Sequence, residues 1–244
     1  MQKTVRIPQL IYAFFRTSVD DLQNTYSLSS QQAKLLEEYS QLRTDYVLQE
    51  GWPIDDGGID RDSFDQDPTT HYIVAYTNRV VAGMRMTNVA SIEESLSYHM
   101  WDNAVDKISF KDSLKNSKSL LNKVNSGEIW DITRLVTESN ILALKQPRSR
   151  ALSRVGLFKI LARGLSISTA DDAWWVFTTT ERMMGFMQKN GFDVTVIATL
   201  KISSTDDSLS SLCIVQPAVV ARSLKKKSPW LHRIARSESK GRVS

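Results

Sequence analysis

Residues 151–200 read ALSRVGLFKILARGLSISTADDAWWVFTTTERMMGFMQKNGFDVTVIATL, and this stretch decides the fold class. Its first part, from about Ala151 to Ser168, has an apolar arc too wide for a surface helix, so we expect a helix packed into the interior. The rest predicts a strand at Trp174–Thr180, a short helix at Glu181–Lys189 stopped by Asn190-Gly191, and a strand at Phe192–Leu200. Strands that alternate with helices indicate an α/β protein.

The sequence on either side of this stretch predicts the same class. An amphipathic helix is expected at Ser29–Glu50, because Leu35, Tyr39 and Leu42 recur at helical spacing. It should lie on a sheet. Further strands are predicted in four places: His71–Tyr76 and Val80–Thr87, which would form a hairpin, then Ile129–Val136 and Leu212–Val215. Residues 91–123 are polar and partly helical, and their pattern predicts no definite arrangement.

The chain of 244 residues is long enough for one sizeable core. We therefore predict one α/β (α+β) domain with a mixed sheet at residues 29–221. An N-terminal extension, 1–28, would precede it, and a basic, disordered tail, 222–244, would follow. The tail has eight Lys or Arg and one Glu, a net charge of +7, so the rest of the chain carries −3 of the total +4.

Several classes of protein are disfavoured. No apolar run is long enough for a membrane span or a signal peptide, so a cytoplasmic protein is expected. The lone Cys213 lies in an apolar stretch, as core residues do. His71, His99 and His232 lack ligand spacing, so a metal site is not expected. No cofactor is expected either. A phosphate loop, a dinucleotide glycine fingerprint and a Gly-x-Ser-x-Gly elbow are all absent.

Charged residues in structured or apolar surroundings are the candidate functional residues. Such groups require partners when buried. Three arginines and three aspartates could form an ionic network at the edge of the sheet, or could simply tie the aspartate-rich loop at 51–70 to it. The six residues are Arg43, Asp62, Asp65, Arg85, Asp131 and Arg134.

The order of these residues resembles the motif set of the acyl-homoserine-lactone synthases, the LuxI-type family. The matching segments are Arg43, Gly51-Trp52, Asp62-Ser63-Phe64-Asp65, Tyr72-Ile73-Val74, Gly83-Met84-Arg85-Met86-Thr87 and Asp131-Ile132-Thr133-Arg134. The resemblance runs from about Arg43 to Leu200. This sequence has Asp131 where the family usually has glutamate, its Arg43-to-Trp52 spacing is one residue short, and about twenty additional residues precede Arg43.

The resemblance implies a three-layer GNAT-like fold, with helices flanking a central mixed, splayed sheet that makes a cleft for a thioester. It also implies an enzyme that transfers an acyl group to the amine of S-adenosylmethionine and then forms the lactone of a quorum-sensing autoinducer, releasing methylthioadenosine. S-adenosylmethionine is a substrate here, not a cofactor. Asp131, Arg134 and Arg85 are the expected catalytic residues, with Asp131 as base. Arg43, Asp62 and Asp65 would hold S-adenosylmethionine and order the loop. Trp52 would stack near the adenosine or the sulfonium, or would equally suit a loop tryptophan that fills the core.

The acyl group would lie against Met84, Phe177, Met183 and Phe186, although these residues would equally suit an ordinary core. An acyl carrier protein is the expected donor and acyl coenzyme A the alternative, because the glycine pattern that binds a pyrophosphate is missing from Gln146 to Gly156. The basic residues Arg148, Arg150 and Arg154 could contact the donor, or could form a solvated surface.

Two other functions stay open. One is an N-acyl amino acid synthase, or another GNAT-type N-acyltransferase that uses a different amine. The other is a non-catalytic GNAT-like module that binds membrane or nucleic acid through its basic tail. Neither a nucleic-acid partner nor a membrane span is part of the favoured interpretation.

Overall fold

The computed structural model describes residues 11–16, 30–49, 60, 62–103, 106–108, 114–138, 147–168, 170–201 and 209–233. The chain divides into two compact units. Unit 1 comprises Met1–Arg85 and Arg134–Leu161, and unit 2 comprises Met86–Thr133 and Ala162–Ser244. Strands β3 (Val80–Val89) and β5 (Ile129–Thr137) and helix α5 (Pro147–Ile167) contribute residues to both units.

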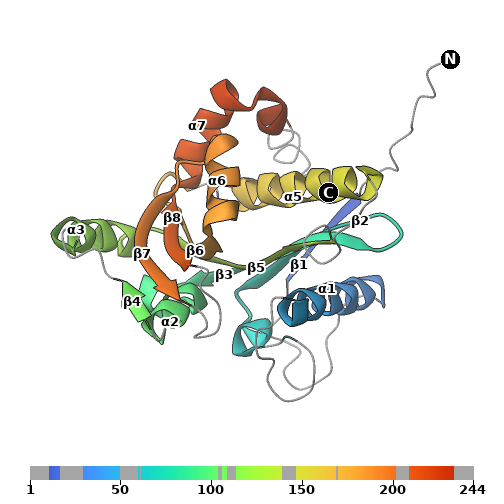
Figure 1. Cartoon of the computed structure of the whole chain (residues 1–244), viewed down its shortest axis with the longest axis horizontal. Coiled ribbons are helices and arrows are strands. Elements are labelled where there is room, and N and C mark those ends of the chain that lie inside the picture. The colour runs from blue at the N-terminus through green and yellow to red at the C-terminus, as the bar shows by residue number, and fades with distance from the viewer. Residues whose placement is uncertain are drawn as a thin grey trace. The chain divides into compact units, whose positions relative to one another are not determined.

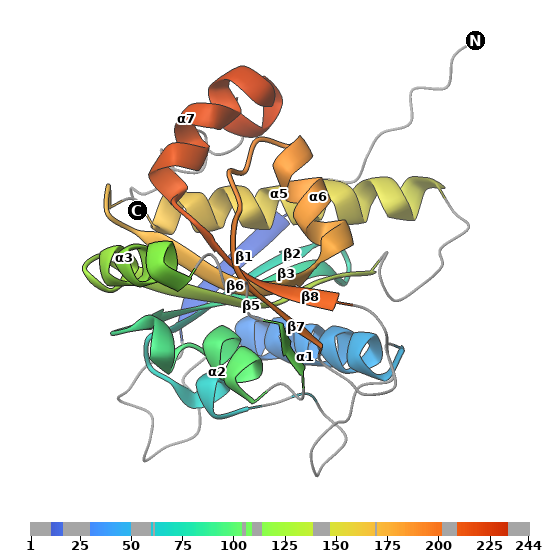
Figure 2. The same cartoon turned by 60° about the vertical axis from the view of Figure 1, so that its left-hand side comes forward.

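Unit 1 is built on strands in the order β1-β2-β3-β5. Its other elements are β1 (Ile11–Arg16), α1 (Ser30–Gln49), the short 3-10 helix η2 (Ser63–Gln66), β2 (Thr70–Tyr76) and the first part of α5. The predicted hairpin is confirmed, since β2 and β3 are neighbours joined by a turn in which Thr77 N donates to Arg79 O at 3.0 Å. Figures 1 and 2 both show α1 and α5 on opposite faces of these strands.

Helix α1 packs on the strands through the apolar residues that its sequence predicts. Leu35, Tyr39 and Leu42 are buried in one cluster with Tyr72 and Val74 of β2 and residues of β3 and β5. Gly83 makes this approach possible, because a Cβ atom there would lie 2.5 Å from the ring of Tyr39. The predicted helix at Ser29–Glu50 is confirmed, and its contact with the sheet fixes the position of Arg43.

The N-terminal segment differs from the prediction. Residues 11–16, assigned from sequence to an extension outside the domain, form β1, which pairs antiparallel with β2 from Ile11↔Tyr76 to Arg16↔His71. Its sequence, IYAFFR, is rich in the β-branched and aromatic residues that favour strands. The folded part of the chain therefore begins before Ser29.

Unit 2 has strands in the order β5-β6-β8-β7-β4. Its strands are β4 (Asp106–Ile108), β6 (Trp174–Thr180), β7 (Thr195–Lys201) and β8 (Leu209–Val215), with parts of β3 and β5. β5 and β6 are parallel and the other registers are antiparallel, so the predicted mixed sheet is confirmed. The parallel register between β5 and β6 runs from Ile129↔Trp174 to Asp131↔Val176.

Residues 91–123, for which the sequence predicted no arrangement, form the 3-10 helix η3 (Ile92–Glu94), helix α2 (Leu96–Asp102), β4, and helix α3 (Leu114–Asn125). Ile92 from this segment and Val124, at the end of α3, are buried in the core of unit 2. They pack there with Trp174, Val176 and residues of β7 and β8. These short elements are mostly polar in sequence, so the sequence pattern did not indicate the apolar residues that anchor them in the core.

Helices α6 (Glu181–Lys189) and α7 (Pro217–Lys227) complete unit 2. The predicted stop of α6 is confirmed, because Asn190 caps it and Gly191 has φ 96°, a conformation that favours glycine. The expected tail boundary at residue 222 is wrong, because α7 continues to Lys227 and residues 229–233 are also helical. Leu224 and Leu231 are fully buried, and this apolar anchorage keeps the basic segment folded.

Helix α5 also begins earlier than predicted, at Pro147, a residue favoured in the first turn of helices. Residues 147–150 of the predicted basic loop are therefore helical. None of the helices in the described part of the chain combines the length and apolarity that a bilayer crossing requires.

Candidate active site

Six charged side chains of unit 1 form a closed ring of salt bridges in which arginine and aspartate alternate. Each arginine contacts the aspartates on both sides of it, with N–O distances from 2.6 to 3.0 Å. In order around the ring the residues are Arg43, Asp60, Arg134, Asp62, Arg85 and Asp65. We call this set the charge ring. Its formal charges cancel, as buried charges require.

The short helix η2 brings two of the aspartates into the charge ring. Asp62 caps η2, because its Oδ1 accepts from Phe64 N at 3.0 Å, and Asp62 N in turn donates to Asp65 Oδ2 at 3.1 Å. This reciprocal arrangement is a capping box, in which Asp65 takes the role usually filled by Glu or Gln. The carboxylates of Asp62 and Asp65 therefore stabilise the backbone of the short helix that carries them.

Asp65 is the most heavily bonded carboxylate of the charge ring. Arg43 donates to it as a fork, with Nη1 at 3.0 Å from Oδ1 and Nη2 at 3.1 Å from Oδ2. Arg85 Nη1 and the hydroxyl of Tyr72 also donate to Oδ1, at 2.8 and 2.9 Å. Forked arginine–carboxylate pairs are among the stronger protein hydrogen bonds. Asp65 therefore joins α1, β2 and β3.

Arg85 and Arg134 share Asp62. Arg85 Nη1 and Nη2 donate to Asp62 Oδ1 and Oδ2 at 2.6 and 2.9 Å, and Arg134 Nη2 donates to Oδ2 at 2.9 Å. Arg134 also contacts Asp60 Oδ1 at 3.0 Å. Asp60 closes the ring through Arg43 Nε, 3.0 Å from its Oδ2.

Arg134 has a strained backbone. Its φ of 54° lies in the left-handed region, which large side chains seldom occupy and which costs of order 1–3 kcal/mol. The surrounding contacts hold it, since Tyr39 donates its hydroxyl to Arg134 O at 2.7 Å and the side chain is bridged to two carboxylates. Strain of this kind concentrates at functional sites, so Arg134 is the member of the charge ring with the clearest sign of a role beyond folding.

The charge ring fixes its own protonation states. Burial would raise the pKa of Asp65, but hydrogen bonds and charge from Arg43 and Arg85 outweigh it and hold that pKa well below its usual value. The pKa of Asp62 is lowered against burial in the same way by Arg85 and Arg134. Burial raises the pKa of Tyr39, which stays a hydroxyl donor. At neutral pH both carboxylates are therefore ionised.

Exposure divides the charge ring into an inner and an outer side. The side chains of Arg43 and Arg85 are 1% and 0% exposed, whereas those of Arg134 and Asp62 are 24% and 18% exposed. A ligand can reach Arg134 and Asp62 in this conformation, but not Arg85. Arg85, one of the predicted catalytic residues, donates from the inner side to Asp62 and Asp65.

Asp131 lies in unit 2, where α2 binds both of its carboxylate oxygens. Ser97 Oγ donates to Oδ1 at 2.5 Å and Leu96 N donates to Oδ2 at 2.8 Å. Ser97 is itself buried, and its carbonyl accepts from Thr178 Oγ1 of β6 at 3.2 Å. The predicted set of three aspartates therefore needs correction, because Asp60 is the third carboxylate of the charge ring.

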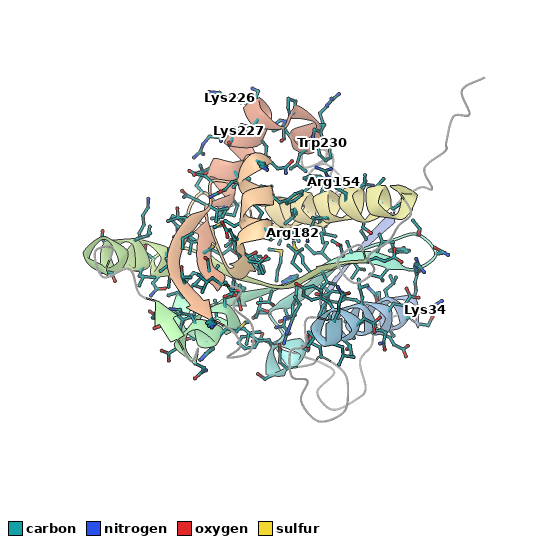
Figure 3. All side chains as sticks on the ribbon, viewed as in Figure 1. Lys34, Arg154, Arg182, Lys226, Lys227 and Trp230 are labelled. Atoms are coloured by element: carbon teal, nitrogen blue, oxygen red, sulfur yellow. The ribbon has the colours of Figure 1, made fainter. Side chains whose placement is uncertain are left out.

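The remaining predicted residues lie in several places. Met84 is buried in unit 1, while in unit 2 Phe177 is buried and Met183 and Phe186 are half-buried on α6. Arg154 is exposed on α5 (Figure 3). Arg148 and Arg150 lie in the first turn of α5, but their side chains fall outside the described residues, as does Trp52. Within the described ranges no His, Cys, Asp and Glu side chains group as a metal site would require.

Two residues of these sites were missed by sequence reasoning. Asp60 had a signal, since the loop reads Asp60-x-Asp62-x-x-Asp65 and so offers a third acid beside the two that were predicted. Ser97 had none, because nothing in a polar helix distinguishes the serine that meets a carboxylate of a distant strand.

Comparison with solved structures gives the fold. BjaI, described as a CoA-dependent acyl-homoserine lactone synthase with SAM and isopentyl-CoA, superposes with a TM-score of 0.53 at 17% identity, over 93% of this chain and 98% of BjaI. TofI, in a ternary complex with an inhibitor and MTA, gives 0.54 at 15% identity, over 90% and 98%. This chain shares their fold.

A third structure broadens the comparison. FeeM, an N-acyl amino acid synthase from uncultured soil microbes, gives a TM-score of 0.54 at 11% identity, over 88% of this chain and 94% of FeeM. No protein-family model and no curated protein sequence matches the chain. The fold is thus the one that these three structures share, as the predicted GNAT-like α/β fold requires, and the activity is to be argued from the residues of the site.

Proposed function

We propose that this chain is an acyl-homoserine-lactone synthase. It would transfer an acyl group from a thioester to the amine of S-adenosylmethionine and close the lactone with release of methylthioadenosine. The observation that carries the proposal is the charge ring, because five of its six members are the arginines and aspartates of the resemblance. The fold shared with BjaI and TofI, crystallised with SAM and MTA respectively, supports it.

In this proposal Arg134 and Asp62 are the residues that S-adenosylmethionine meets. Its methionine carboxylate would pair with the guanidinium of Arg134, whose Nε is a buried donor without a hydrogen-bond partner among the described atoms. Its amine and sulfonium are cationic and would face Asp62. Arg43, Arg85 and Asp65 would hold these two side chains still, and Trp52 would lie against the adenosine or the sulfonium.

The chemistry requires a base, an oxyanion donor and correct positioning. Asp131 is our candidate base, acting on the amine directly or through a water, because a positioned carboxylate can take up the proton that the attacking amine loses. A backbone N–H at the strand splay that the resemblance implies would stabilise the oxyanion of the thioester carbonyl. The sulfonium is a good leaving group, so positioning of the methionine carboxylate can supply most of the lactonisation step.

An acyl carrier protein is the proposed donor, bound by Arg148, Arg150 and Arg154 at the start of α5. Its acyl chain would lie against Met84, Phe177, Met183 and Phe186. The exposed position of Arg154 supports contact with an acidic protein, and the missing pyrophosphate glycines argue against coenzyme A. A cytoplasmic location belongs to the same proposal, because both substrates are made there. The test is Arg154→Glu, which should raise KM for acyl carrier protein and leave KM for acyl coenzyme A unchanged, with Lys34→Glu as control.

Turnover of the purified chain with S-adenosylmethionine and a panel of acyl carrier proteins and acyl coenzymes A tests the function. Methylthioadenosine and a lactone, identified by mass spectrometry, are the expected products. Arg134→Gln should lower kcat/KM roughly 10²-fold by displacing the substrate, while Lys34→Gln on α1 leaves it unchanged. Release of an acylated amine without methylthioadenosine would refute the synthase.

The second candidate, an N-acyl amino acid synthase, is favoured by one observation, the equal structural similarity to FeeM. A free amino acid would present the same carboxylate to Arg134, but it lacks the sulfonium. Competition separates the two candidates: S-adenosylhomocysteine should inhibit a synthase, and should not affect an enzyme whose amine is a small amino acid.

A further inference from the structure

The exposed face of α7 and of the helical turn at 229–233 is strongly basic and carries a tryptophan. From residue 217 to residue 233 the sequence has five Lys or Arg and no acid. All five are exposed, and Trp230, in the helical turn that follows α7, is 38% exposed. We call these six residues the C-terminal basic surface: Arg222, Lys225, Lys226, Lys227, Trp230 and Arg233. Figure 3 labels Lys226 and Lys227 on one side of α7 and Trp230 on the turn that follows it.

The C-terminal basic surface is built on a fixed support. The opposite side of α7 is buried through Pro217, Val220 and Leu224, and Leu231 anchors the turn that follows. The turn after α6 lies against it, since a Cβ on Gly191 would be 3.3 Å from Lys227 Cβ. The cations are therefore presented by an ordered helix. None of the five pairs with a carboxylate in the part of the chain that the structure describes.

We propose that the C-terminal basic surface binds the anionic surface of a lipid bilayer. Clusters of four to eight Lys or Arg on an amphipathic helix are typical of binding to anionic lipid headgroups. Tryptophan is enriched at membrane–water interfaces, where its ring lies among the headgroups. The proposal is independent of the proposed function, because none of these residues belongs to the charge ring or to the proposed donor site.

Two other occupants fit less well. Arginine predominates where proteins recognise individual phosphates through bidentate contacts, whereas this helix ends in three consecutive lysines, which act as point charges toward a diffuse field. An acidic protein would complement the charge, but it would leave Trp230 without the interfacial environment that its exposure matches. A lipid headgroup layer satisfies both the lysines and the indole.

Sedimentation of the full-length chain with vesicles tests the proposal. Binding should occur with phosphatidylcholine mixed with phosphatidylglycerol, fail with phosphatidylcholine alone, and weaken as salt is added. Each lysine near an anionic surface contributes roughly fivefold to partitioning, so Lys226→Gln/Lys227→Gln should reduce it about 25-fold. Trp230→Ala should reduce it at every salt concentration, because the indole contribution is not electrostatic.

The matched control is Lys34→Gln/Lys123→Gln, which removes two exposed lysines elsewhere on the chain and should leave partitioning unchanged. Unchanged melting temperatures of both double variants show that any loss of binding is not unfolding. Absence of binding to the anionic vesicles, or an equal loss in the control, overturns the proposal. Binding to duplex DNA or to an acyl carrier protein through the same lysines, without binding to vesicles, overturns it as well.

Discussion

Asp65→Asn should destabilise the protein strongly at neutral pH and progressively less in acid. The substitution preserves shape but replaces a carboxylate that four donors from Arg43, Arg85 and Tyr72 approach within 3.1 Å. The guanidiniums of Arg43 and Arg85 are almost fully buried and would lose a counter-charge. Removing one partner from such a buried pair costs about 3–5 kcal/mol. That is a large part of the 5–15 kcal/mol typical of a domain.

The dependence on pH follows from the direction of the pKa shift. Because the folded-state pKa of Asp65 is lowered, its contribution to the free energy of unfolding is complete above the unfolded pKa of about 3.9 and is lost as pH falls toward the folded value. Denaturant unfolding of Asp65→Asn and of wild type, from pH 7 to pH 3, should show a gap that narrows below about pH 4.

The control is Asp45→Asn on the exposed face of α1, where the change should stay within about 0.5 kcal/mol at every pH. Two results would refute the reasoning. One is equal unfolding midpoints for Asp65→Asn and wild type at pH 7. The other is a gap that stays constant down to pH 3, which would mean that the ionisation of Asp65 does not support the fold.

Three further substitutions test other parts of the structure. Gly83→Ala should cost about 1–3 kcal/mol of unfolding free energy, because its Cβ would meet an aromatic ring of α1 at 2.5 Å. Gly191→Ala should lower the free energy of unfolding by about 1–2 kcal/mol, because Gly191 has a positive φ. Gly185→Ala, in open space within α6, should leave that free energy unchanged or raise it. Urea unfolding measures both effects. Ser97→Ala should cost about 1.5–3 kcal/mol by removing a donor to buried Asp131, and Ser97→Thr should restore part of it in thermal melts.

The sequence predicted those parts of the fold in which local pattern and tertiary packing agree. The helix at Ser29–Glu50 and the hairpin that follows it have clear periodicity, and their apolar residues are the ones that pack. The strand at residues 11–16 was not predicted, because there the local pattern alone did not indicate the tertiary pairing. Its composition is rich in residues that favour strands, but only the register with β2 establishes it as part of the sheet.

Charge balance predicted a network of three arginines and three aspartates, and the structure confirms an ionic network that contains the three arginines. Charge balance could not identify the third aspartate, because Asp60 and Asp131 both lie close to an arginine in the sequence. The contact with Ser97, which lies 34 residues earlier than Asp131, depends on where α2 packs in unit 2. Single-sequence patterns carry no information about such distant pairings.

The closed alternation of the charge ring limits how the protein can change. Replacing one member of the charge ring with an uncharged residue leaves five charged residues with a net charge of +1 or −1. Both neighbours of the replaced residue lose a salt-bridge partner. Replacing an adjacent arginine and aspartate together, as in Arg85→Met with Asp62→Leu, leaves an open chain of four residues with no net charge. We therefore expect accepted substitutions in the charge ring to occur in coupled pairs, with the single substitutions as less fit intermediates. The six residues would then evolve together.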